Sequence, residues 1–268
     1  MQAHPLKKNN VTIEGNQDAE KTLIFAHGFG TDQTSWYRVK DAFKHNYRIV
    51  LYDNVGSGKA DINAYSPIRY STLNSYADDL IDIAKTLDLR NTTVVAHSAS
   101  SMICALAGIK APEYFSKQVF IGASPRYLND NPYKGGFEQA DMEAVFEAMS
   151  TNYYAWVSGF SGIMMGNSER PELREEFAGT LSSLRPDIAF SVLKLILQSD
   201  LRDVLPEIQK ETLIVQSYDD AAVPLEVGEY LNKNIRNSRL VKIKATGHFP
   251  QISAPEEVIK SINSFILN

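Results

Sequence analysis

Val94–Ser101 reads Val-Val-Ala-His-Ser-Ala-Ser-Ser, an apolar run that stops abruptly at Ser98. The run predicts a buried strand, and apolar residues at helical spacing follow it. A strand, a sharp turn and a helix therefore place the hydroxyl of Ser98 at the apex. Small residues two positions before and after such a serine let the strand and helix backbones approach closely, and here they are Ala96 and Ser100.

The same steric rule distinguishes between the neighbouring serines. If Ser100 were at the apex, the residue two positions later would be Met102, and for Ser101 it would be Ile103. Both side chains are too bulky for the close backbone approach, so Ser98 is the candidate nucleophile. Alanine and serine replace the two glycines of the G-x-S-x-G pattern, and a serine-rich helix cap is the alternative interpretation of this stretch.

Composition restricts the class of protein. The chain has 268 residues, of which 44% are hydrophobic and 22% charged, as expected of a soluble globular protein. A net charge of -5 without a basic stripe argues against nucleic acid as a partner. No apolar run is long enough to span a membrane, and the N-terminus lacks the apolar core of a signal peptide. Cys104 is the only cysteine, which predicts a cytoplasmic protein and a buried apolar thiol rather than a nucleophile.

Apolar runs alternate with helical patterns along most of the chain, which predicts an α/β fold with a mostly parallel central sheet. Leu73–Leu87 is amphipathic at helical spacing, and Pro255–Leu267 predicts a closing helix. The predicted strands are Val11–Glu14, Thr22–Ala26, Tyr47–Tyr52, the run before Ser98, Gln118–Ile121, Thr212–Gln216 and Arg239–Ile243.

The alternation breaks between about Ala123 and Asp203, where no convincing strand occurs and aromatic residues and methionine are frequent. Helical patterns in this span cover Phe137–Met149, Asn152–Phe160, Pro171–Ser183 and Arg185–Ser199. An all-helical insertion above the strand ends predicts a lid. We therefore expect residues 1–123 and 204–268 to form a core, with residues 124–203 inserted as the lid.

A serine hydroxyl needs a base to take its proton, and the α/β-hydrolase order is Ser, then Asp or Glu, then His. Among five histidines only His248 follows Ser98 with room for an acid between them. It lies in a loop between the last strand and the closing helix. The acid is expected after the strand Thr212–Gln216, where Asp219 and Asp220 are adjacent and the residues alone favour neither.

An oxyanion hole needs two backbone N–H groups directed at the developing charge. The N–H of Ala99, directly after the nucleophile, is one candidate. The other is Phe29, which lies between glycines in His27-Gly28-Phe29-Gly30 after a predicted strand. Residues 56–59, Gly-Ser-Gly-Lys, lack the spacing of a phosphate-binding loop, and no cluster has the spacing of metal ligands. We therefore predict no metal and no cofactor.

The chain resembles a specific α/β-hydrolase family, the bacterial stress regulator RsbQ and the related plant receptors for strigolactones and karrikins. The resemblance runs essentially from end to end. It rests on residues 27–33 (His-Gly-Phe-Gly-Thr-Asp-Gln), 53–58 (Asp-Asn-Val-Gly-Ser-Gly), 124–130 (Ser-Pro-Arg-Tyr-Leu-Asn-Asp), 135–139 (Gly-Gly-Phe-Glu-Gln), 185–188 (Arg-Pro-Asp-Ile) and 222–224 (Ala-Val-Pro).

The resemblance implies an α/β-hydrolase fold with a four-helix, V-shaped cap over an apolar pocket. It implies Asp220 as the acid, four positions before Pro224, and Phe29 and Ala99 as the oxyanion donors. Pocket-lining positions are implied for Phe29, Phe137, Trp156, Phe160 and Phe190, although the last four could equally pack inside the lid.

The expected function is hydrolysis of a small apolar ester or lactone, butenolide-like in this family, by Ser98, His248 and Asp220. The resemblance implies that hydrolysis is coupled to signalling. The alternative is a slow ligand receptor or partner-binding regulator with only residual hydrolysis. The lid would then bind a PAS-domain phosphatase, as implied for RsbQ-like proteins, or another signalling protein.

Overall fold

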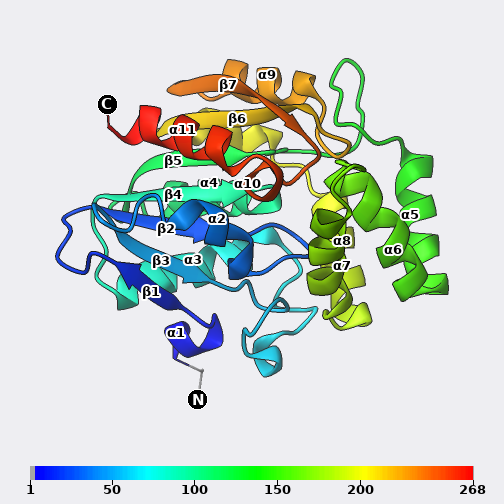
Figure 1. Cartoon of the computed structure of the whole chain (residues 1–268), viewed down its shortest axis with the longest axis horizontal. Helices are drawn as coiled ribbons and strands as arrows, with labels where there is room; N and C mark the ends of the chain where they lie inside the picture. Colours follow the sequence, from blue (N-terminus) through cyan, green and yellow to red (C-terminus); the bar gives the residue numbers. More distant parts are fainter. Residues whose placement is uncertain (1–3, 268) are drawn as a thin grey trace.

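The computed structural model describes residues 4–267 and contains a seven-stranded sheet with helices on both faces (Figure 1). The strand order is β1-β3-β2-β4-β5-β6-β7, with β1 antiparallel to β3 and all other neighbours parallel. This arrangement confirms the predicted fold class. The strands are β1 (Thr12–Gly15), β2 (Thr22–Ala26), β3 (Arg48–Tyr52), β4 (Thr92–His97), β5 (Phe115–Ile121), β6 (Glu211–Asp219) and β7 (Ser238–Thr246).

Helices cover the sheet on two sides. One side carries α3 (Leu73–Thr86), α4 (Ala99–Lys110) and α9 (Leu225–Asn234), and the other carries α2 (Tyr37–Lys40) and α11 (Pro255–Ile266). The remaining short elements are α1 (Pro5–Lys8), η1 (Gln33–Trp36), η2 (Ile62–Ala64), η3 (Arg202–Glu207) and α10 (Pro250–Ser253). Within residues 4–267, no helix has the length and apolarity to cross a membrane.

Side chains of each central strand alternate between two apolar layers. In β2, Leu23 and Phe25 pack against α2 and α11, whereas Ile24 and Ala26 pack against α3 and α4. All five residues of the strand are buried. Burial of both faces explains why this strand is a continuous apolar run in the sequence rather than an alternating one.

Four helices between β5 and β6 stand beyond the carboxyl ends of the strands, at the right of Figure 1. They are α5 (Gln139–Thr151), α6 (Tyr153–Met165), α7 (Pro171–Ser182) and α8 (Pro186–Gln198). Helix α6 packs on α5 and α7, and α5 also packs on α8. Helix α5 begins two residues later than predicted because Glu138 and Asp141 form a capping box at its start.

Strand β6 is longer than the predicted Thr212–Gln216. Its pairing with β7 continues to Asp219, which lies opposite Thr246, and the carbonyl of Asp219 accepts a hydrogen bond from the N–H of Gly247 at 2.7 Å. Asp219 therefore belongs to the strand, and Asp220 is the first residue beyond it. This register separates the two aspartates that the sequence left equivalent.

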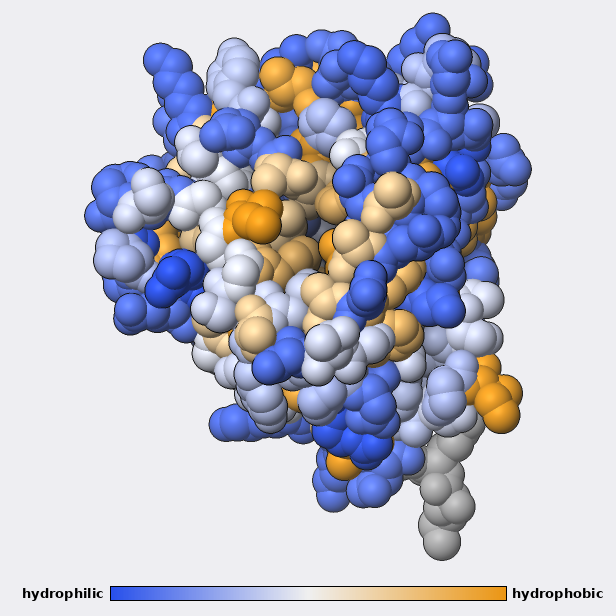
Figure 2. All heavy atoms as spheres, turned by 90° about the vertical axis from the view of Figure 1, so that its right-hand side faces the viewer, coloured by the Kyte–Doolittle hydropathy of each residue, from blue (hydrophilic) through white to orange (hydrophobic). Residues whose placement is uncertain are grey.

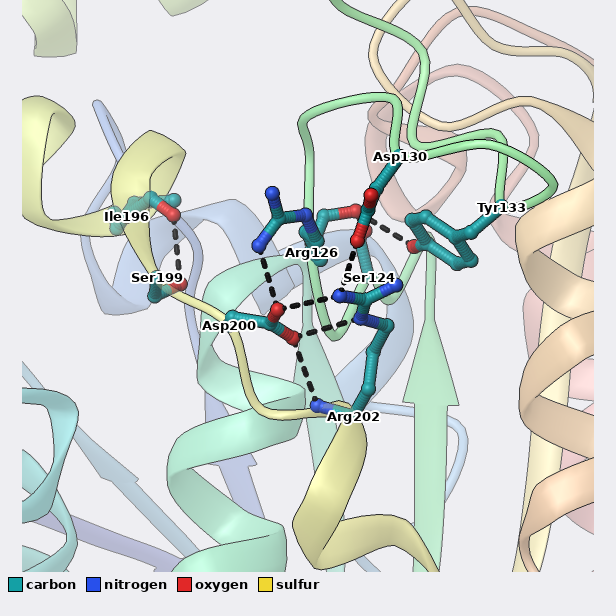
Figure 3. A network of polar contacts seen from close by, with 8 residues as sticks. All are labelled: Ser124, Arg126, Asp130, Tyr133, Ile196, Ser199, Asp200 and Arg202. Atoms are coloured by element: carbon teal, nitrogen blue, oxygen red, sulfur yellow. Dashed lines mark hydrogen bonds and ion pairs between the residues drawn. The ribbon is translucent and has the colours of Figure 1, made fainter.

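The two chain segments that connect the core to α5–α8 are joined by a network of ion pairs (Figure 3). Asp200 accepts hydrogen bonds from Arg126 at 2.5 Å and from Arg202 at 2.9 and 2.7 Å. Arg202 also contacts Asp130 at 2.7 Å. Hydrogen bonds, chiefly from Arg202, lower the pKa of the Asp200 carboxyl to about 2. We call these four residues the clasp.

We expect Asp200→Asn to lower the free energy of unfolding by about 1 kcal/mol at pH 7, a value reduced for the partial exposure of this carboxyl. Because its pKa is lower in the folded chain, the contribution is complete above about pH 5 and is lost as the pH falls towards 2. Urea denaturation of both proteins at pH 7 and pH 3 measures this. A difference that stays constant or grows between pH 7 and pH 3 would contradict it.

Candidate active site

Ser98 lies at a strained turn between β4 and α4. Its backbone has φ +56° and ψ −130°, a region that residues with a side chain rarely occupy. The Ser98 N–H donates a hydrogen bond to the carbonyl of Ile121 on β5 at 2.8 Å, which ties the turn to the neighbouring strand. The predicted strand, turn and helix are therefore present, with the serine hydroxyl at the apex.

The turn is surrounded by close backbone contacts that need small side chains. The Ser100 hydroxyl donates a hydrogen bond to the carbonyl of His27 at 2.5 Å, so this serine joins the turn to the loop after β2. A methyl group added at Gly28 would lie 2.5 Å from Nδ1 of His97 and 3.1 Å from Cβ of Ser98. Only glycine fits at position 28 without displacing the ring of His97, the residue directly before the serine.

His248 accepts the proton of the candidate nucleophile. Its Nε2 lies 2.8 Å from Oγ of Ser98, and its Nδ1 lies 2.9 and 3.0 Å from the two carboxyl oxygens of Asp220. A neutral ring protonated at Nδ1 donates to the carboxylate and accepts from the serine hydroxyl. All three side chains are buried, so water competes little for these hydrogen bonds.

The backbone of His248 is fixed from two directions. Its carbonyl accepts from Nε2 of His97 at 2.7 Å, and its N–H donates to the carbonyl of Met164 at the end of α6 at 2.7 Å. Burial lowers the pKa of His97 well below its usual value, so this ring stays neutral. At Gly247, with φ +87°, an added methyl group would lie 1.9 Å from the carbonyl of Met165. The histidine loop and α6 thus fit together through backbone atoms.

Asp220, and not Asp219, lies beside His248. One oxygen of Asp220 also accepts from the backbone N–H groups of Ala222 and Val223, at 2.9 and 3.1 Å. These donors stabilise the ionised carboxylate in a buried place and orient it towards the imidazole. Asp219 is exposed and lines a separate surface hollow near the ends of β6 and β7.

Ala99 follows the serine directly, and Phe29 lines the same cavity as Ser98. Ala99 begins α4, so its N–H belongs to the first turn of a helix, where backbone donors lack partners within the helix. Phe29 follows β2, which pairs with β4 on one side. Among the residues that the structure describes, neither N–H group has a hydrogen-bond acceptor. Both donors are available to an oxyanion beside Ser98.

A mostly apolar cavity that partly opens to solvent adjoins these side chains. Figure 2 shows its mouth, where apolar residues surround a hollow at the end of the molecule formed by α5–α8. The lining residues are Phe29, Ser98, Tyr127, Phe137, Val145, Phe160, Met164, Phe177, Leu193, Ile196, Leu197, Ala222, His248 and Phe249. The cavity suits an apolar ligand with one polar, reactive group next to Ser98.

Phe29, Phe137 and Phe160 line this cavity, but Trp156 and Phe190 do not. Trp156 stacks on Phe160, with ring centroids 4.6 Å apart. Phe190 packs edge to face on Phe146 at 5.7 Å. The pocket-lining positions implied for Trp156 and Phe190 are therefore corrected to the stated alternative, in which both rings pack against other aromatic rings of α5–α8.

The sequence did not indicate Tyr127, whose hydroxyl lies 3.3 Å from Oγ of Ser98. It follows β5 in an irregular segment, where neither helical nor strand periodicity predicts the direction of a side chain. The only sequence signal is its position within residues 124–130, one of the stretches that carry the family resemblance. Among residues 4–267, no group of three or more His, Cys, Asp or Glu side chains is arranged to hold a metal.

Comparison with known proteins agrees with this architecture. Residues 21–255 match the family model for the alpha/beta hydrolase fold. The chain is 44% identical to the karrikin insensitive 2 receptor CA of Petunia hybrida, covering 94% of this chain and 93% of the relative. It is 43% identical to strigolactone esterase D14 of Arabidopsis thaliana, covering 94% of each. A solved hydrolase from Oleispira antarctica superimposes with a TM-score of 0.95 at 35% identity, covering 98% of this chain and 96% of that one. The resemblance to the strigolactone and karrikin receptors is thus confirmed.

Proposed function

The chain belongs to the α/β-hydrolase fold family, and we propose that it is a serine hydrolase of small, largely apolar esters or lactones. The observation that carries the proposal is the hydrogen-bonded series from Ser98 through His248 to Asp220 at the base of an apolar cavity. The substrate class is supported by the names of two relatives, a strigolactone esterase and a karrikin insensitive 2 receptor. Butenolide-like lactones are the first candidates.

In the proposed reaction, Oγ of Ser98 attacks the carbonyl carbon while Nε2 of His248 takes the hydroxyl proton. Asp220 keeps the imidazole in the required tautomer and stabilises its charged form. The negative oxygen of the tetrahedral intermediate accepts hydrogen bonds from the N–H groups of Phe29 and Ala99. His248 then gives the proton to the leaving oxygen, and an ester on Ser98 remains. Water, activated by His248, hydrolyses this ester and restores the serine.

We also propose that residues 124–203 act as a lid over a core of residues 1–123 and 204–268. Support comes from the position of α5–α8 beyond the strand ends and from the many cavity residues that they contribute. A cytoplasmic location fits the single cysteine, Cys104, which is buried and free.

Ser98→Ala should abolish turnover of p-nitrophenyl acetate, with a loss of at least about 10³-fold in kcat, because among residues 4–267 only the Ser98 hydroxyl is hydrogen-bonded to Nε2 of His248. The measurement is release of p-nitrophenolate, with circular dichroism and thermal melting as the check on folding. A folded variant that retains full turnover would rule out the proposed mechanism.

Asp220→Asn should lower kcat by about 10⁴-fold, the loss seen in a serine protease triad, because the amide favours the wrong imidazole tautomer. Asp219→Asn is the matched control, since the same chemical change is made one residue away on an exposed side chain. It should leave kcat within about threefold of the parent. The opposite pattern would show that the acid has been assigned to the wrong aspartate.

A second candidate function is a receptor or regulator with slow hydrolysis, coupled to signalling as in RsbQ-like proteins. It is favoured by the names of the relatives and by two exposed apolar side chains on α6, Tyr154 and Ile163, which are 64% and 63% exposed. Such a regulator would bind a signalling protein, for example a PAS-domain phosphatase, through α6.

For this second function, turnover of a butenolide should be at least about 10³-fold slower than the roughly 10 s⁻¹ of an average enzyme. Ile163→Asp should weaken binding of a purified PAS-domain phosphatase from the same source, measured by calorimetry. Ile68→Asp is the control, because Ile68 is also exposed, at 87%, but lies outside residues 124–203. Fast turnover together with no binding by the parent would leave hydrolysis as the function.

A further inference from the structure

Tyr127 contacts the reacting oxygen but has no part in the triad. Its hydroxyl lies 3.3 Å from Oγ of Ser98, and the residue is only 4% exposed. Within residues 4–267 this is the only hydrogen bond that its hydroxyl makes. A buried hydroxyl without a partner is costly, so this contact fixes where the Tyr127 proton points.

The direction of the hydrogen bond follows from counting protons. Ser98 has one hydroxyl proton, and it is donated to Nε2 of His248. The Tyr127 hydroxyl must therefore donate to Oγ, which still has a free lone pair. Burial raises the pKa of Tyr127 far above neutrality, so the phenol keeps its proton at any working pH. Oγ of Ser98 thus donates one hydrogen bond and accepts another.

Tyr127 and the proposed oxyanion donor Phe29 follow strands on opposite sides of β4. Strand β4 lies between β2 and β5 in the sheet. Phe29 follows β2, whereas Tyr127 follows β5, and Asp220 follows β6 further along the same side. Tyr127 therefore comes from the part of the chain that follows β5, on the same side of β4 in the sheet as the strand that carries Asp220.

The position of Tyr127 is fixed by the segment around it, which Figure 3 shows in part. The carbonyl of Arg126 accepts hydrogen bonds from the hydroxyls of Ser124 and Tyr133, at 2.7 and 2.6 Å. The carbonyl of Tyr127 accepts from the N–H of Phe137 at 3.0 Å. Since Arg126 also belongs to the clasp, the phenol is held before any substrate arrives.

We propose that Tyr127 is a further catalytic residue, whose hydroxyl donates a hydrogen bond to Oγ of Ser98 as that oxygen leaves during deacylation. This inference rests on the proposed serine-hydrolase function. In that step water attacks the acyl carbon and gives a proton to His248. The bond from carbon to Oγ then breaks, its electron pair goes to Oγ, and His248 returns the proton to it. Tyr127 donates a hydrogen bond throughout and transfers no proton.

The effect of this hydrogen bond differs between the two halves of the reaction. In acylation, Oγ begins as a hydroxyl oxygen that already accepts from Tyr127, so little is gained on the way to the transition state. In deacylation, Oγ begins as an ester oxygen, which is a weak acceptor, and gains electron density as the bond breaks. The hydrogen bond strengthens only in that second step, and so it accelerates deacylation selectively.

The test is Tyr127→Phe, with p-nitrophenyl acetate as the probe. Acylation is measured as release of p-nitrophenolate in a single turnover with enzyme in excess. Deacylation is measured as the decay of the acetyl-enzyme, followed by intact-protein mass spectrometry. The loss of one hydrogen bond should slow deacylation by about threefold to tenfold and leave acylation within about twofold, so that acetyl-enzyme accumulates.

Tyr52→Phe is the matched control, because the Tyr52 hydroxyl is also buried but has no partner among the described residues and lies away from the cavity. It should change neither rate constant. An equal loss in both steps for Tyr127→Phe would indicate that Tyr127 only supports the cavity, and unchanged deacylation would overturn the proposal outright. In either case, an acetyl group that forms on the parent protein but not on Ser98→Ala would still support the proposed hydrolase function. An acetyl group that also forms on Ser98→Ala would contradict both the hydrolase function and the proposed role of Tyr127.

Discussion

The arrangement of this protein depends on one steric constraint, the close approach of three backbone segments around Ser98. The serine adopts positive φ, its N–H is bound to β5, and the loop after β2 passes so near that only glycine fits at position 28. The cost of this conformation is of the order of 1–3 kcal/mol and must be offset by the packing of β4 between β2 and β5. In return the hydroxyl is held clear of its own backbone, where His248 can reach it.

The four helices beyond the sheet do more than cover the cavity, because one of them, α6, is bonded to the backbone beside the reacting histidine. Met164 at the end of α6 accepts a hydrogen bond from the backbone of His248, and Gly247 is in backbone contact with Met165. A shift of α6 would therefore move the imidazole as well as the cavity wall. In this geometry, a change in the shape of the cavity at α6 also changes the alignment of the candidate triad.

The residues that sequence reasoning located were those fixed by chain order or by local sterics. The small residues around Ser98 were sufficient to identify the candidate nucleophile. The position of His248, the only histidine after Ser98 with room for an acid between them, was sufficient to identify the candidate base. The choice between Asp219 and Asp220 depended on where the pairing of β6 with β7 ends, which local sequence does not specify. The positions of Trp156 and Tyr127 were not predicted for a related reason. Aromatic character indicates that a ring is buried, but it does not indicate which residues the ring contacts.

The clasp has a consequence for how such a chain diversifies. Arg126 and Asp200 lie opposite one another, so the helical insert leaves the sheet and rejoins it at adjacent points. For the sheet, the stretch between these two residues is thus closed off at its base, so a change of length within α5, α7 or α8 need not shift the registration of β5 and β6. Helix α6 is the exception, because its end is bonded to the backbone of His248, so sequence variation that alters the cavity without disturbing the triad is expected away from the end of α6.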